Sequence, residues 1–182
     1  MSNVAVLNGS PRRKGNTAAL CEAFADGARE AGNSVEVLHL EGLGIHGCKG
    51  CCCGDNLREN PCVQRDGMIE VYRAVRASDV VVLASPLYYW MVSGQLRCAI
   101  DRLYALEEGD ENLLRGHGRA SALLMAAQGH AFEAATQYFD CLCERLRWQN
   151  LGHVLAGGNL NAGDIAGKPE LAQARRLGAS IG

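Results

Sequence analysis

The first residues able to do chemistry form a loop at positions 8–17 that is rich in glycine, hydroxyl and basic side chains. Its glycines let backbone N–H groups converge, and the helix expected after it adds partial positive charge at its N-terminus. The side chains that can donate hydrogen bonds there are Ser10, Arg12, Lys14, Asn16 and Thr17. The loop predicts a phosphate site. The alternative is a solvated basic turn with Asn16 or Thr17 as an ordinary helix cap.

Two well-known phosphate loops do not match this segment. A Walker A loop requires Lys-Ser/Thr directly after its second glycine, whereas Asn16 follows Gly15 here. A dinucleotide-binding loop requires a third glycine and a later acidic residue for the ribose, and neither is in register. The pattern therefore favours a mononucleotide over a dinucleotide.

A second candidate loop carries Tyr88, Tyr89 and Trp90 in succession. Three consecutive aromatic residues cannot all face a core, so at least one is expected to be exposed and able to stack on a planar ring. A subunit interface is an alternative use for them, and both uses are compatible. A further loop with Gln128 and Gly129 is expected to complete the same pocket.

Five short apolar runs alternate with segments of helical period, which is typical of a parallel sheet covered by helices on both faces. The predicted strands are 4–7, 35–40, 80–84, 120–126 and 151–156. This rhythm suits a doubly wound α/β fold of order 2-1-3-4-5, in which ligands bind where strands one and three diverge. The phosphate loop and the aromatic loop follow those two strands.

These two loops carry the resemblance to a known family. Gly-Ser-Pro-Arg-x-x-Gly-Asn-Thr at 9–17 and Ser-Pro-Leu-Tyr-Tyr-Trp-x-x-Ser-x-Gln-Leu-(x)4-Asp-Arg at 85–102 resemble the NADPH-dependent FMN reductases of the flavodoxin-like superfamily. The resemblance implies a three-layer flavodoxin-like sandwich whose first loop holds the FMN phosphate. It also implies that the flavin ring is lined by Pro86, Leu87, Tyr88, Tyr89 and Trp90. Asp101 and Arg102 match as well, and we expect them to be structural.

Five of the nine cysteines crowd into positions 48–62. This segment resembles the four-cysteine motif of the iron-sulfur flavoproteins, which implies [4Fe-4S] ligands at Cys48, Cys51, Cys53 and Cys62. Gly54 stands where the third cysteine of that motif belongs, so Cys53 or Cys52 has to substitute. A zinc site and free thiols remain open. The other four cysteines, Cys21, Cys98, Cys141 and Cys143, are expected to be small buried apolar residues in helices.

The hypothesis that the same segment is a phosphatase active site has weaker support. Cys52 and Arg58 have the spacing of a thiolate phosphatase, but Cys141 and Arg147 repeat that spacing inside a predicted helix. No strand precedes the first pair to aim a thiolate.

The bulk composition excludes several classes of protein. A net charge of -2, from 18 basic and 20 acidic residues mixed along the chain, provides no extended basic surface for nucleic acid or anionic membranes. The apolar run 4–7 is too short for a signal or membrane segment. We expect a cytoplasmic protein with one domain over 1–182, a cysteine-rich insert at about 46–66, and small-molecule partners.

The function expected from these features is an FMN-dependent oxidoreductase. The flavin would accept hydride from NAD(P)H and pass electrons to a quinone, a flavin or another small acceptor, so no catalytic side chain is required. The alternative is an electron carrier of the flavodoxin or iron-sulfur flavoprotein type that does not oxidise NAD(P)H itself. The near-neutral charge favours the reductase, because carriers tend to be strongly acidic. The resemblance further implies a homodimer or homotetramer.

Overall fold

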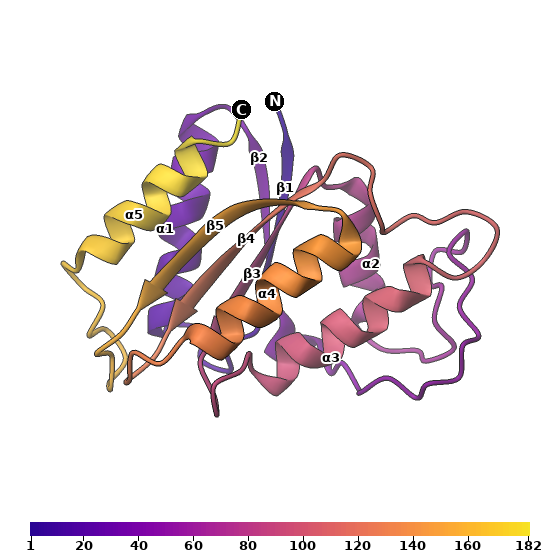
Figure 1. Ribbon diagram of the computed structural model, residues 1–182, viewed down its shortest axis with the longest axis horizontal. Coiled ribbons are helices and arrows are strands. Elements are labelled where there is room, and N and C mark those ends of the chain that lie inside the picture. The colour runs from indigo at the N-terminus through magenta and orange to yellow at the C-terminus, as the bar shows by residue number, and fades with distance from the viewer.

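A computed structural model describes residues 1–182 and contains one sheet of five parallel strands in the order β2-β1-β3-β4-β5 (Figure 1). The strands are β1 (Asn3–Asn8), β2 (Ser34–His39), β3 (Val80–Pro86), β4 (Ala120–Ala126) and β5 (Gln149–Ala156). The helices are α1 (Asn16–Glu30), α2 (Met68–Ala77), α3 (Gly94–Arg102), α4 (Glu133–Leu146) and α5 (Pro169–Ala179), with short 3-10 helices η1 (Leu40–Leu43) and η2 (Leu103–Leu106). The predicted fold class and strand order are confirmed.

The central strands are apolar along their whole length because helices cover both of their faces. Every residue of β4 is buried, and β3 is exposed only partly at Pro86. Val4 of β1 pairs with Val35 on one side and Val80 on the other. The outer strands β2 and β5 are largely half-exposed, as expected at the edges of the sheet.

Two apolar cores lie on opposite faces of the sheet. Alternate strand residues such as Leu7 and Leu83 pack with α2, α3 and α4, whereas Val6 and Val82 pack with α1 and α5. Figure 1 shows α1 and α5 side by side on their face. Their contact is close: a Cβ at Gly27 would lie 2.0 Å from the backbone oxygen of Arg175.

Most expected elements are present, with small shifts at their ends. The predicted helix Met68–Ala77 is α2. Leu40, expected at the end of the second strand, instead begins η1. The expectation of four buried helical cysteines is correct for Cys21 and Cys143 and wrong for Cys141, which is exposed, while Cys98 is half-buried. Cys141 lies on the outer side of α4, away from its buried residues Phe139 and Cys143.

The cysteine-rich insert has no helix or strand from 46 to 66 and runs as an extended loop between η1 and α2. It packs against α3 and η2, at the side of the molecule opposite α5 (Figure 1). None of the helices has the length and apolar character needed to cross a bilayer.

Candidate functional site

The loop after β1 folds around the buried hydroxyl of Ser10. The Ser10 amide donates to Asn8 Oδ1 (2.9 Å), and the Arg12 amide donates to Ser10 Oγ (3.2 Å). The Gly15 amide then closes the loop by donating to the Arg12 carbonyl (3.1 Å). A Cβ at Gly15 would lie 3.0 Å from that of Arg12, so the turn favours glycine. These contacts hold the loop in a compact curl beside the start of α1.

The first turn of α1 is left free to bind an anion. The backbone amides of Asn16, Thr17 and Ala18 donate no hydrogen bond within the chain, and no side chain caps the helix. The turn contains no acidic residue. Free amides and the helix dipole both favour negative charge at this position. The side chain of Arg12, which is exposed, adds a cation to this anion-binding turn.

The side chain of Asn16 has a different role from that of its amide. Its Nδ2 donates to the carbonyl of Asn161 (2.8 Å), while its Oδ1 accepts from the amides of Gly163 (2.9 Å) and Ile165 (3.4 Å). These bonds join α1 to the loop after β5, more than 140 residues away in sequence. Asn16 therefore offers a ligand its backbone amide, because its side chain is engaged.

The aromatic segment after β3 forms a tight turn. The amides of Tyr88 and Met91 each donate to the other residue's carbonyl, at 2.9 and 3.1 Å. The two residues between them have positive φ angles, 48° at Tyr89 and 64° at Trp90. This is the pattern of a type I′ turn, which normally favours Asn-Gly. Tyr89 is 93% exposed and Trp90 60% exposed, so the prediction of an exposed aromatic is correct.

A cavity of ≈ 270 Å³ lies where these loops meet at the carboxyl ends of the strands. It is lined by Ser10, Arg12, Gly15, Asn16, Thr17, Pro86, Leu87, Tyr88, Ala126, Ala127, Gln128, Asn159 and Leu160. Four predicted residues are not part of the lining: Lys14, Tyr89, Trp90 and Gly129. All but Trp90 adjoin a lining residue in the chain. No carboxylate contributes to the wall. The cavity therefore combines anion-binding groups at one part of its wall with apolar and aromatic groups at another.

Several lining residues were absent from the sequence prediction. Asn159 and Leu160 follow β5, where the Gly157-Gly158 pair marks a loop at the same edge of the sheet. Asn159 is buried, its amide donates to Ala127 (2.8 Å), and its Nδ2 donates to the carbonyl of Ala156 (2.8 Å). That glycine pair was the available signal for this loop.

The five crowded cysteines border a second, smaller cavity of ≈ 60 Å³. Cys48, Cys51, Cys52 and Cys53 are exposed, whereas Cys62 is half-buried. No three His, Cys, Asp or Glu side chains in the chain are gathered in a way that could hold a metal ion. The thiols therefore share one cavity wall but do not converge on a common point.

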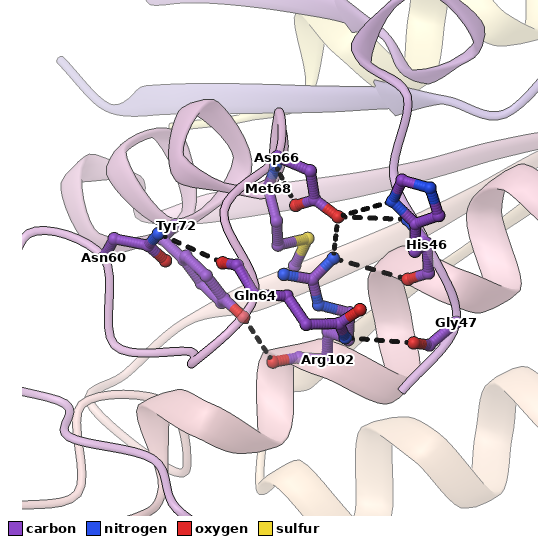
Figure 2. Close-up of polar contacts among 8 residues, drawn as sticks. All are labelled: His46, Gly47, Asn60, Gln64, Asp66, Met68, Tyr72 and Arg102. Carbon is purple, nitrogen blue, oxygen red and sulfur yellow. Dashed lines mark hydrogen bonds and ion pairs between the residues drawn. The ribbon is translucent and has the colours of Figure 1, made fainter. Parts of the chain in front are cut away.

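Arg102 anchors this region through a buried ion pair (Figure 2). Its Nη1 donates to Asp66 Oδ2 (2.5 Å) and to the His46 carbonyl (3.3 Å). Asp66 also accepts hydrogen bonds from the amides of His46 (3.1 Å) and Met68 (3.1 Å). Burial raises the pKa of Asp66, but these hydrogen bonds outweigh it and bring the pKa to about 2. The expected structural role of Arg102 is therefore fulfilled with Asp66, and Asp101 pairs instead with Arg97 (2.9 Å).

Cys62 interacts with the same guanidinium. Burial raises the pKa of its thiol, whereas the Gln64 amide and the Arg102 guanidinium lower it. Together these effects bring the pKa of Cys62 below its ordinary value. Tyr72 also contacts the sulfur, and its hydroxyl donates to the Arg102 carbonyl (3.0 Å). Cys62 is thus the one cysteine of the segment that is held in place by buried polar groups.

Comparison with known proteins places the chain in a family. The family model for NADPH-dependent FMN reductase matches residues 2–161. An iron-sulfur flavoprotein of Archaeoglobus fulgidus is 34% identical over 181 residues, which are 100% of this chain and 79% of that protein. Among solved structures, the NAD(P)H:quinone oxidoreductase from Methanothermobacter marburgensis has a TM-score of 0.65 at 18% identity, covering 98% of this chain and 94% of that one.

An FMN-dependent NADH-azoreductase from Bacillus anthracis has a TM-score of 0.69 at 11% identity, with 97% of each chain covered. At these low identities the two structures support the fold alone, and the match to the family model supports the membership. The chain belongs to the NADPH-dependent FMN reductase family.

Proposed function

We propose that this protein binds FMN in the ≈ 270 Å³ cavity and is a flavin-dependent oxidoreductase that takes hydride from NAD(P)H. Electrons would then pass to a quinone, a flavin or another small acceptor. The observation that carries the proposal is the free first turn of α1, whose three unpaired amides adjoin Ser10 and Arg12 in a wall without carboxylates. A phosphate monoester satisfies such a site because its oxygens accept several hydrogen bonds.

The rest of the cavity fits the other parts of FMN. Pro86, Leu87 and Tyr88 form a wall with apolar and aromatic surface beside the anion-binding turn. The amides of Tyr89 and Trp90 make no hydrogen bond within the chain, so they are free to meet polar ring atoms, whereas that of Tyr88 is used in the turn. FMN supplies the hydride chemistry when bound, and the protein positions it. No side chain is proposed as a catalytic acid or base.

The absorbance spectrum of the purified protein, followed by an NADPH or NADH consumption assay, tests the proposal. We expect flavin bands and steady consumption with a quinone, a dye or free flavin as acceptor. Flavin reduction only by a partner protein would favour the electron carrier instead. A protein that neither retains nor binds FMN in titration would contradict both.

A second candidate property is an iron-sulfur centre held by the cysteine-rich insert. Relatives named iron-sulfur flavoproteins support it, as do the five cysteines that line the ≈ 60 Å³ cavity. The proposed ligands are Cys48, Cys51, Cys53 and Cys62, with Cys52 as the substitute for Cys53. Because the thiols do not converge, the exposed segment 48–53 would have to close around the centre. Iron and acid-labile sulfide assays on anaerobically purified protein decide this. Protein that contains zinc instead of iron, or no metal at all, would contradict the proposal.

The proposed assembly is a homodimer or homotetramer. The exposed Tyr89 and Trp90 at the rim of the cavity support it, because exposed aromatic side chains are enriched where subunits meet.

A further inference from the structure

Arg102 is unusual among the arginines of this chain because its side chain is completely buried yet only partly satisfied. Its exposed fraction is 0%, and only Nη1 finds acceptors, on Asp66 and His46 (Figure 2). Nε and Nη2 are buried without a hydrogen-bond partner. A guanidinium offers five N–H donors, and leaving buried donors unpaired is costly. The arrangement therefore has unused donor capacity on one side of a fixed cation.

Arg102 is also close to the cysteines of the insert. Arg102 lies beside the Cys62 sulfur and lines the same ≈ 60 Å³ cavity as all five cysteines of the insert. It is the only basic residue in the cavity wall, which also contains the carboxylates of Asp101 and Glu108. Each cysteine that ligates a metal does so as a thiolate and brings one negative charge. A thiolate-bound centre here would have the Arg102 cation in its wall.

The unpaired polar atoms of the molecule also concentrate in this region. Eight buried side-chain nitrogen or oxygen atoms lack a partner, and six of them belong to Asn56, Asn60, Arg76 and Arg102. Asn56 and Asn60 lie within the insert, and Arg76 contacts it by donating to the Asn56 carbonyl. Native proteins satisfy nearly all such groups. Of these residues, only Arg102 lines the cysteine cavity, so its unpaired donors are the ones that a group bound there could reach.

We propose that Arg102 is a positioning residue of the iron-sulfur site, holding Cys62 in a ligating orientation and offsetting the negative charge of the cysteine ligands. The inference rests on the iron-sulfur centre proposed above. Asp66 holds the guanidinium through Nη1 and does not line the cysteine cavity, so the cation stays in place whether or not the exposed cysteines have closed. A cation next to such a centre stabilises the reduced state, which carries the more negative charge, and so raises the reduction potential.

The test compares the Arg102→Gln variant with wild-type protein after anaerobic reconstitution with ferrous iron and sulfide. We expect about tenfold weaker iron retention, as is typical when a group that supports a metal ligand is removed, and a lower reduction potential. Arg102→Lys keeps the charge and is expected to restore the potential towards the wild-type value. Arg29→Gln is the control, because Arg29 is exposed, pairs only with Asp26, and neither residue lines the cysteine cavity.

If Arg102→Gln does not fold, the double variant Asp66→Asn/Arg102→Gln leaves no unpaired buried charge and takes its place. We expect the same direction of change, since Arg102 lines the cysteine cavity and Asp66 does not. Unchanged iron retention and potential in either folded variant would overturn the inference while leaving the iron-sulfur proposal intact. A wild-type protein that takes up no iron and sulfide would overturn both, and FMN titration of the same samples reports separately on the flavin site.

Discussion

Arg12 is the only cationic side chain in the wall of the larger cavity, and it is exposed at the rim of the free helix turn. We predict that Arg12→Ala weakens FMN binding by about 10- to 100-fold, the value of one hydrogen-bonded contact to a charged group. Titration of flavin fluorescence against apoprotein measures this. The fold should persist, because Arg12 contributes only its backbone to the loop.

Arg13→Ala is the matched control, since Arg13 is the next residue along the loop and does not line the cavity. Its loss should change FMN affinity little. Equal affinities for wild type and Arg12→Ala would show that the phosphate does not lie at this turn.

The turn after β3 places two bulky aromatic residues in left-handed backbone conformations, at Tyr89 and Trp90. Such residues cost on the order of 1–3 kcal/mol each, and strain of this kind is retained where it serves a function. We predict that the variant Tyr89→Asn/Trp90→Gly, which supplies the preferred type I′ pair, raises the free energy of unfolding by about 1–2 kcal/mol. Urea denaturation of the apoprotein measures this.

The same variant is expected to lose oxidoreductase turnover, since the exposed rings border the proposed flavin site. Tyr89→Ala is the control: it removes an aromatic ring without making the left-handed conformation easier, so no gain in stability is expected. An Asn-Gly variant that is less stable than wild type would argue that the aromatic rings contribute packing and that the turn is not strained.

The Asp66–Arg102 ion pair joins the insert to α3 and makes the stability of the whole molecule depend on pH. The pKa of Asp66 falls from 3.8 to about 2 on folding, so its stabilising contribution is fully present above about pH 4 and disappears as the pH falls through 2. The linkage corresponds to about 2 kcal/mol. Urea denaturation between pH 6 and pH 2 should show this loss in wild-type protein.

Asp66→Asn should remove that part of the pH dependence and lower stability near neutral pH by about 3 kcal/mol, because Arg102 is left buried without a counter-charge. Asp26→Asn, which breaks only an exposed pair with Arg29, is the control. A wild-type profile in Asp66→Asn would show that another carboxylate governs acid unfolding. Because both cores share one sheet, we also propose that residues 1–182 unfold as a single domain.

The amino-acid sequence by itself determined the sheet, its order and three of the loops that border the cavity, those after β1, β3 and β4. Those features depend on local causes: short apolar runs form strands, apolar residues at helical spacing form helices, and Gly9 and Gly15 allow the tight curl before α1. The exposure of the consecutive aromatic residues was predictable for the same reason. Strand order then brings the loops after β1 and β3 together.

Only the tertiary structure decided which distant residues complete each site. Asn159 and Leu160 enter the larger cavity, and the Asn16 side chain bonds to Asn161 instead of remaining free. The environment of Cys62 depends on Arg102, 40 positions later in the sequence. Such contacts follow from how helices and loops pack across the sheet. A local pattern of residue types cannot predict that packing.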